Sequence, residues 1–164
     1  MRRNGVWIAA AVLVVVGLLG WWTAHGITSA EGAQNKAVVD ATATATVQAE
    51  VSRALSQVLS YDHASPGTTE AAADEVLAGA ARKEYDTLFA TLEKKAPGQK
   101  LVLTAQVQSV GVKELTADTA KLLVFLDQSS QRATDSEASL SAAQLAVGAK
   151  KVNGSWKITS LKPL

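Results

Sequence analysis

The feature that most constrains this chain is an uncharged, proline-free run of seventeen residues from Val6 to Trp22. A helix of that length reaches about 25 Å, and the stretch from Gly5 to Ala24 reaches about 30 Å, the thickness of a hydrocarbon core. The run is apolar on every side, whereas a helix that packs on a soluble core keeps a polar face. We therefore predict a single N-terminal transmembrane helix over residues 6–22.

The residues that flank this run indicate how the predicted span is oriented in the membrane. Arg2 and Arg3 precede it, and Trp21 and Trp22 close it. Basic residues favour the cytoplasmic side of a span, and tryptophans gather at the membrane–water interface. We expect residues 1–5 in the cytoplasm and everything after the span outside the cytoplasmic membrane.

A cleaved signal peptide is the alternative, because Thr28-Ser29-Ala30 offers small residues ahead of Glu31. The apolar run is longer than the usual core of a signal peptide, and the bulky tryptophans crowd the approach to a cleavage site. Both observations favour an uncleaved anchor. The cytoplasmic membrane is therefore the first predicted partner.

The composition of the remainder excludes several classes of protein. The 142 residues after the run (164 minus 22) suffice for one compact domain. They hold 14 basic and 15 acidic residues, since two of the 16 basic residues precede the run, and their formal charge is −1. A nucleic-acid surface needs clustered excess Lys and Arg, so no nucleic-acid partner is expected. The absence of cysteine excludes disulfides, thiolate catalysis and cysteine-ligated zinc.

Residues 23–35 are small and polar and are interpreted as a linker, which leaves residues 36–164 as the extracytoplasmic domain. A long amphipathic helix is predicted over residues 36–60. Its apolar side chains recur at steps of three and four: Val47, Val51, Leu55, Val58 and Leu59.

Two further helices are predicted before the character of the sequence changes. The second begins near Thr69, which can act as its N-cap, and Gly79 breaks it. The third covers residues 80–95, with an apolar stripe around Tyr85, and residues 96–98 (Ala-Pro-Gly) end it.

Period-two alternation then indicates strands. It runs from Leu101 to Val107, after which the apolar phase switches to Val110 and Val112, as it does at a β-bulge. Residues 120–126 are almost continuously apolar, which predicts a central strand covered on one side and packed closely on the other. The phase switch after Val107 predicts that the sheet bends.

The remaining two strands are predicted over residues 139–152 and 156–161. Between them, Asn153-Gly154 is the strongest hairpin signal in the chain, because both residues tolerate the positive φ of a type I′ turn. Three helices followed by four antiparallel strands predict an α+β fold. Its helices would pack on a strongly bent four-stranded sheet, as in a cone or cystatin-like roll.

The order of several short motifs resembles that of the Mce-associated membrane proteins of actinobacteria. After the single span come a long helix ending in Leu59-Ser60-Tyr61-Asp62, then Leu77-Ala78-Gly79 leading into Glu84-Tyr85, then bent strands closing on Gly154-Ser155-Trp156-Lys157-Ile158. The resemblance covers essentially the whole chain. Residues 63–68, HASPGT, depart from the family's basic and hydrophobic continuation.

The resemblance implies a cone domain of the nuclear-transport-factor-like (SnoaL-like) type, tethered outside the membrane. It also implies an accessory subunit of an Mce complex, which imports lipids or sterols through the cell envelope. The architecture is similar to the periplasmic scaffold protein of type IV secretion machines, which is the second assignment. The expected partners are Mce subunits, with a lipid or sterol as a further one.

Candidate catalytic groups are few. His63 lies beside Tyr61 and Asp62, but it falls just past a predicted helix end, where a surface role is favoured over that of a catalytic base. Asp127 and Arg132 are expected to form a solvent-exposed ion pair at a strand end. No metal site, catalytic residue or cofactor is predicted.

Structural roles are predicted for the remaining motif residues. Tyr61 and Tyr85 are expected to bury their rings, and core packing is favoured over ligand binding for Trp156. The leading hypothesis is a non-enzymatic, membrane-anchored accessory or scaffold subunit of an Mce-type import complex. The alternatives are a lipid-binding module with its ligand in the cone cavity, a type IV secretion-like scaffold and, last, an enzyme using His63 or Asp127.

Overall fold

The structure, a computed structural model, describes residues 35–164. The predicted transmembrane helix and almost all of the predicted linker lie outside the described residues, as do the flanking residues Arg2, Arg3, Val6, Trp21 and Trp22. Within residues 35–164, no helix is both long enough and apolar enough to cross a bilayer.

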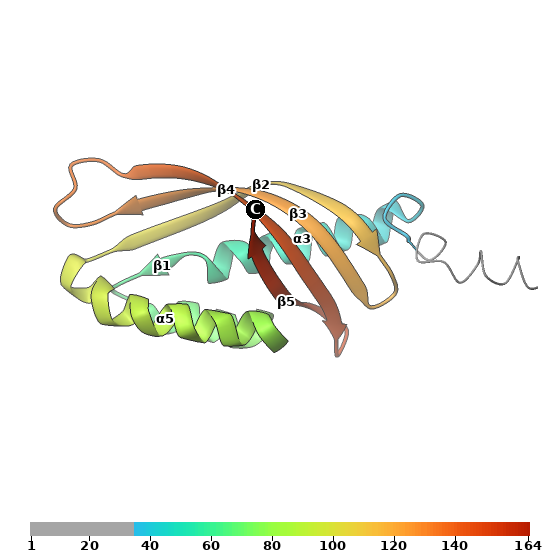
Figure 1. Ribbon diagram of the computed structural model, residues 1–164, viewed down its shortest axis with the longest axis horizontal. Helices are drawn as coiled ribbons and strands as arrows, with labels where there is room; N and C mark the ends of the chain where they lie inside the picture. Colours follow the sequence, from blue (N-terminus) through green and yellow to red (C-terminus); the bar gives the residue numbers. More distant parts are fainter. Residues whose placement is uncertain (1–34) are drawn as a thin grey trace, which may run out of the picture. The chain divides into compact units, whose positions relative to one another are not determined.

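The predicted α+β class is confirmed for the described domain. The helices are α3 (Ala41–Val58), α4 (Pro66–Val76) and α5 (Gly79–Gln99), and all three precede the four long strands. The strands are β1 (Tyr61–Asp62), β2 (Val102–Leu115), β3 (Thr119–Gln131), β4 (Ser139–Val152) and β5 (Ser155–Pro163). In Figure 1 the long strands arch over α3 and α5.

Helix α3 begins five residues later than predicted, because residues 36–40 form a turn that Asp40 closes. The Asp40 side chain accepts a hydrogen bond from the backbone N–H of Ala43 at 2.9 Å, which makes Asp40 the N-cap. The helix then buries one stripe against the sheet, formed by Val47, Val51, Ala54, Leu55 and Val58. This is the stripe that the sequence periodicity predicts.

Helix α4 begins at Pro66 and not near Thr69. Proline at the first helical position lacks only an N–H that would have had no partner within the helix. The prediction that Thr69 caps this helix is wrong. Thr69 lies within the helix and is buried, and its hydroxyl donates to the carbonyl oxygen of Ser60 at 3.0 Å.

Gly79 separates α4 from α5, as predicted, with a φ of +59° that an L side chain rarely adopts. The predicted end of α5 at residues 96–98 is wrong, since the helix continues to Gln99. Gln99 is held from outside the helix. Its carbonyl accepts from the N–H of Ala133 at 3.1 Å, and its side chain accepts from Arg132 Nε at 2.7 Å. Tertiary contacts therefore override the local stop signal.

The sheet has five strands in the order β1-β2-β3-β4-β5, all antiparallel neighbours, and not the four predicted. The extra strand, β1, has only two residues. Tyr61 pairs with Leu103 and Asp62 with Val102. The prediction placed Tyr61 and Asp62 at the end of the long helix, because a two-residue strand has no periodicity of its own.

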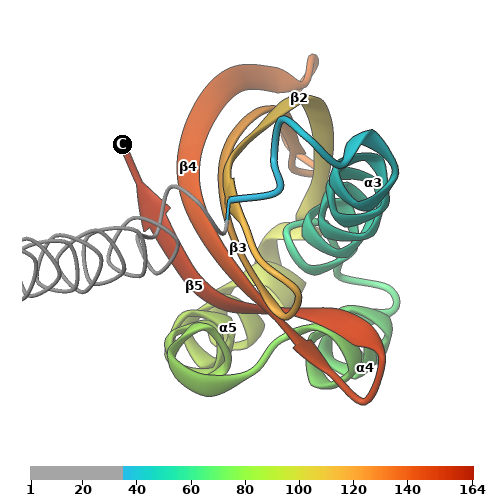
Figure 2. The same ribbon diagram turned by 90° about the vertical axis from the view of Figure 1, so that its right-hand side faces the viewer.

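The phase change that the sequence shows after Val107 is a β-bulge in the structure. The register of β2 against β3 shifts between Val107 and Ser109, and again between Val112 and Glu114. Each bulge adds twist, and the sheet curls when it is viewed along its length (Figure 2). The predicted bend is thus confirmed.

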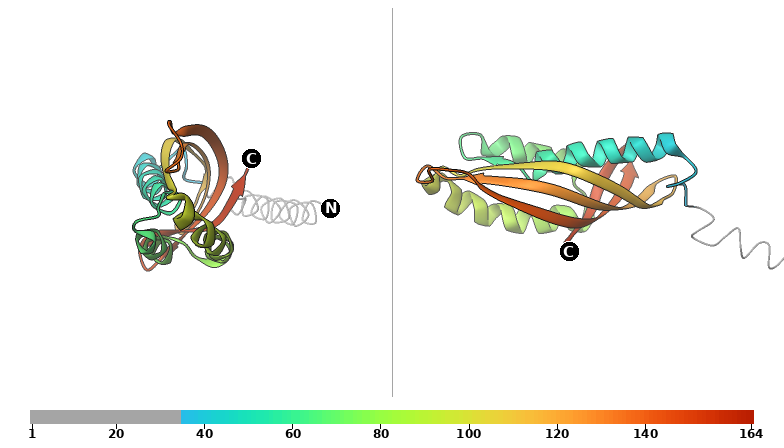
Figure 3. Two further views of the ribbon diagram at one scale, coloured as in Figure 1. Left: turned by 90° about the vertical axis from the view of Figure 1, so that its left-hand side faces the viewer. Right: turned by 90° about the horizontal axis from the view of Figure 1, so that it is seen from above.

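Strand β3 is central, as predicted, but only one of its faces is buried. Ala120, Leu122, Val124 and Leu126 are buried, whereas Leu123 and Phe125 on the opposite face are 37% and 39% exposed. The close packing predicted for that second face is wrong. In the described domain the helices gather along one side of the sheet (Figure 3).

The C-terminal strand joins the helical half to the sheet. Leu77, between α4 and α5, forms an isolated parallel bridge with Ile158, and the N–H of Ala78 donates to the carbonyl of Ile158 at 2.8 Å. Ile158 itself is fully buried. Strand β5 therefore closes a core to which α3, α4 and β2–β4 contribute.

The predicted hairpin at Asn153-Gly154 is present, with φ values of +51° and +89°.

Replacing Gly154 by alanine is expected to lower the free energy of unfolding by about 1–2 kcal/mol, because the left-handed backbone conformation costs an L residue about that much. A Cβ at this position would have no heavy atom within 4 Å among the described residues, so backbone strain alone would act. Urea unfolding of residues 36–164 measures the change. Asn153→Gly is the control and should be nearly neutral, and equal losses from both variants would contradict this account.

Candidate functional site: a polar groove beside Trp156

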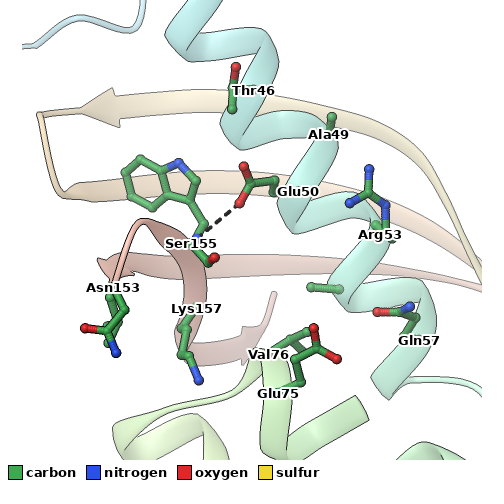
Figure 4. Close-up of a pocket in the computed structure, with 13 residues that line it drawn as sticks. Thr46, Ala49, Glu50, Arg53, Gln57, Glu75, Val76, Asn153, Ser155 and Lys157 are labelled. Atoms are coloured by element: carbon green, nitrogen blue, oxygen red, sulfur yellow. Dashed lines mark hydrogen bonds between the residues drawn. The ribbon is translucent and has the colours of Figure 1, made fainter.

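A groove of about 780 Å³ opens between α3, the end of α4 and the β4–β5 hairpin (Figure 4). This volume lies within the roughly 300–1,000 Å³ typical of ligand sites. Its lining residues are Thr46, Ala49, Glu50, Arg53, Ala54, Gln57, Glu75, Val76, Val152, Asn153, Ser155, Trp156 and Lys157.

Helix α3 supplies one wall of the groove from a stripe that runs beside its buried face. The groove-lining positions share one side of the helix, because each lies three or four residues from another of them: Thr46, Ala49, Glu50, Arg53 and Gln57. The neighbouring stripe enters the core. The same helix therefore holds the domain together and presents polar side chains to solvent.

Trp156 forms the opposite wall, and α3 holds it in place. The backbone N–H of Trp156 donates to Glu50 Oε2 at 3.1 Å, which ties β5 to the helix (Figure 4). The side chain is 8% exposed, and Lys151 Nζ lies 5.9 Å from the ring centroid. Such a cation–π contact adds a modest attraction at an exposed site. Trp156 lies on β5 two residues after the turn at Asn153-Gly154 and pairs with Lys151 across the hairpin.

The groove carries charges of both signs. Two acidic side chains, Glu50 and Glu75, and two basic ones, Arg53 and Lys157, line it. Its lining includes neither histidine nor cysteine. Among residues 35–164, no group of three His, Asp or Glu side chains could hold a metal ion. The arrangement suits recognition of a polar, mixed-charge surface.

Tyr61 and Tyr85 lie in a separate aromatic cluster with Phe89, away from the groove. The Tyr61 and Phe89 rings meet edge to face at 5.9 Å, and those of Tyr85 and Phe89 stack at 5.2 Å. Arg82 lies 5.6 Å from the Tyr85 ring centroid. With Leu101, Tyr61 and Phe89 form a second small core. These contacts fasten α5 to β1 and the start of β2.

The residues around His63 form a local turn. Asp62 Oδ1 accepts from the N–H of Ala64 at 2.8 Å, and the N–H of His63 donates to Leu101 at 3.1 Å. His63 Nδ1 lies 3.5 Å from Asp62 Oδ1, but it forms no hydrogen bond with any described residue. His63 does not line the groove.

The predicted ion pair between Asp127 and Arg132 is wrong. Arg132 Nη1 lies 3.8 Å from Asp135, and its Nε donates to Gln99, because the chain turns after β3 and carries Arg132 toward the end of α5. Asp127 is exposed on the face of β3 that Leu123 and Phe125 share. It also lies outside the Trp156 groove.

The structure thus does not bring the predicted motif residues together. Asn153 and Trp156 line the groove, Gly154 shapes its hairpin, Gly79 divides two helices, and the tyrosines lie elsewhere. Sequence reasoning missed the charged members of the groove: Glu50, Arg53, Glu75 and Lys157. The stripe on α3 was the available signal, but its partners come from α4 and β5, which periodicity does not connect.

Comparisons with known proteins identify relatives without a known role. No family model matches the sequence. The uncharacterised proteins MT1407 (strain CDC 1551 / Oshkosh) and Rv1362c (strain ATCC 25618 / H37Rv) of Mycobacterium tuberculosis are each 37% identical over 111 residues. The match covers 65% of this chain and 49% of each relative. The chain therefore spans about half the length of the curated relatives it matches.

Solved structures share the fold at low sequence identity. A periplasmic fragment of TraM has a TM-score of 0.55 at 11% identity, covering 74% of this chain and 97% of that one. CagV, a VirB8 homologue of the T4SS from Helicobacter pylori strain 26695, gives 0.57 at 12% identity, with coverages of 73% and 96%. The intermembrane-space region of the chloroplast protein ARC6 gives 0.52 at 16%, with 76% and 96%. The likeness shows the fold, which agrees with the predicted cone.

Proposed function

We propose that this protein is a membrane-anchored, non-enzymatic accessory or scaffold subunit whose domain faces a compartment outside the cytoplasm. The domain docks onto partner subunits through the Trp156 groove. The observation that carries the proposal is the fold, which the domain shares with a periplasmic fragment of TraM, a VirB8 homologue and an intermembrane-space region of ARC6. The first is periplasmic, the second belongs to a T4SS and the third lies in an intermembrane space. The apolar run at residues 6–22 supplies the tether.

The chemistry of the groove supports docking over catalysis. Its charged side chains are two carboxylates and two cations, and Glu50 already accepts the backbone N–H of Trp156. The candidate bases His63 and Asp127 do not line it. A mixed-charge surface with one aromatic wall favours a partner of complementary charge, since such patterns select partners and their orientation.

In this proposal the subunit belongs to an Mce-type complex that imports lipid or sterol through the envelope. The order and spacing of the sequence motifs support this assignment, and both curated relatives are mycobacterial. A type IV secretion-like scaffold is the second candidate, favoured by the likeness to CagV.

A lipid held inside the cone is a weaker candidate. Side chains occupy the space between α3 and the sheet, where Val47, Leu55 and Val124 are all 0% exposed. A ligand in that position would have to displace close-packed core residues, which costs several kcal/mol.

Co-purification tests the proposal. The full-length protein, extracted in mild detergent, is expected to recover Mce subunits. Arg53→Glu with Lys157→Glu reverses both basic side chains of the groove and should lower that recovery about tenfold or more, because like charges would then meet. Lys83→Glu with Lys100→Glu alters the net charge equally at exposed positions outside the groove and is the matched control. Failure of the wild-type protein to recover any Mce subunit would contradict the Mce assignment. Equal recovery by both double variants would exclude the groove as the docking site.

A further inference from the structure

The face of the sheet opposite the helices carries a second groove, of about 460 Å³. Its lining residues come from β2, β3, β4 and β5 and from the end of the chain, and none comes from a helix. They are Lys113, Lys121, Leu122, Leu123, Ala146, Val147, Gly148, Ser160, Lys162 and Leu164. We call this the sheet-face groove.

The floor of the sheet-face groove is formed by apolar and small residues of β3 and β4. Leu123 pairs across strands with Ala146, and two residues along β3 Lys121 pairs with Gly148. Leu123 remains 37% exposed although it lies on the central strand. At Gly148, a Cβ would lie 2.5 Å from Ser160 Oγ, so the position has no room for a side chain unless Ser160 moves. Ser160 thus fills the space above Gly148, and the open apolar part of the floor is formed by Leu123 and Ala146.

Three lysines surround this floor. Lys113 is on β2, Lys121 on β3 and Lys162 on β5, so cations flank the floor from both sides. Neighbouring strands lie about 4.8 Å apart, so the three strand intervals from β2 to β5 span about 14 Å, which long lysine side chains can bridge.

The positive charge of this rim is only partly neutralised. Glu114 Oε2 accepts from Lys121 Nζ at 2.7 Å, and this hydrogen bond is the main cause that lowers the pKa of Glu114. The ion pair therefore persists at neutral pH, and Glu114 offsets the charge of Lys121. Lys162 is exposed and forms no ion pair with any described residue. Lys162 thus carries a positive charge that no described acidic side chain neutralises.

The floor offers no ready hydrogen bonds to a peptide. Leu123 and Ala146 lie on strands that are paired on both sides, β3 with β2 and β4, and β4 with β3 and β5. Their backbone groups are therefore used within the sheet. A ligand on this face must be held by apolar contact and by charge, which favours an amphiphile over an extended peptide.

We propose that the sheet-face groove binds a single-chain anionic amphiphile, with its acyl chain along Leu123 and Ala146 and its carboxylate among the lysines. The volume suits one acyl chain, since it lies toward the lower end of the roughly 300–1,000 Å³ range of ligand sites. This site is separate from the Trp156 groove, and it does not depend on the docking role.

Native mass spectrometry of the full-length protein released from detergent micelles tests the site, with palmitate as the probe. Ala146→Phe places a large ring on the floor and should lower palmitate occupancy about tenfold or more. Gln144→Phe adds the same ring on the same strand and face, two residues away and outside the groove, and should leave occupancy unchanged. Both positions are on the helix-free face, and circular dichroism should show both variants folded.

A second comparison tests the role of the lysines. Lys113→Gln with Lys162→Gln should lower palmitate binding about tenfold and leave hexadecanol, which lacks the carboxylate, unaffected. Palmitate binding that survives Ala146→Phe would overturn the proposal. So would binding of an acidic amphipathic peptide, but not palmitate, because the face would then serve a protein partner. Loss of co-purification with Mce subunits has no bearing on this result.

Discussion

Replacing Leu55 by alanine is expected to lower the free energy of unfolding by about 2–5 kcal/mol, because a fully buried leucine leaves a cavity that its neighbours fill only in part. Leu55 is 0% exposed and lies midway along the buried stripe of α3, where the helix meets the sheet. Urea denaturation of residues 36–164, followed by circular dichroism, measures the loss. A loss of this size is a large share of the total free energy of unfolding of a small domain.

The matched control is Leu140→Ala, which makes the same chemical change at a side chain that is 79% exposed. Its effect is expected to stay within about 0.5 kcal/mol, as for most surface substitutions. Similar losses in the two variants would mean that α3 does not form the core of the folded state.

Trp156→Ala is expected to have the second large effect, on stability and on docking together. The ring is 8% exposed, and removing a buried aromatic side chain typically costs about 3–5 kcal/mol. The same change removes the aromatic wall of the groove. We therefore expect lower recovery of partner subunits in co-purification, even at temperatures where the variant remains folded.

Trp156→Phe separates the two effects. Phenylalanine keeps most of the apolar contact, and the backbone N–H that donates to Glu50 is unchanged. Urea unfolding should show a smaller loss than for the alanine variant, and partner recovery should be largely retained. Full recovery by a folded Trp156→Ala protein would remove Trp156 from the docking surface, although its place in the core would stand.

The local features of the fold were predictable where a short stretch of sequence determines them. The apolar stripe of α3 and the phase change after Val107 are periodic patterns, and the turn at Asn153-Gly154 depends on which residues tolerate positive φ. Features that depend on distant partners were missed. Strand β1 exists because Tyr61 meets Leu103, and α5 extends because Arg132 reaches Gln99.

The candidate site was less predictable than the fold, and the reason is also geometric. Glu50 and Trp156 are 106 residues apart in the chain and meet only after the sheet has curled. The sheet-face groove was missed because residues 120–126 are almost all apolar, which resembles a strand buried on both faces. The structure shows one buried and one open face, and the sequence pattern does not distinguish these cases.

The bridge between Leu77 and Ile158 places a constraint on when the domain can fold. A chain that emerges from its N-terminal end presents α3 and α4 long before residues 155–163 appear, yet those residues supply Ile158 and the N–H that Glu50 accepts. Until then the apolar faces of both helices lack part of their cover. The core is therefore completed only after the last strand has been synthesised.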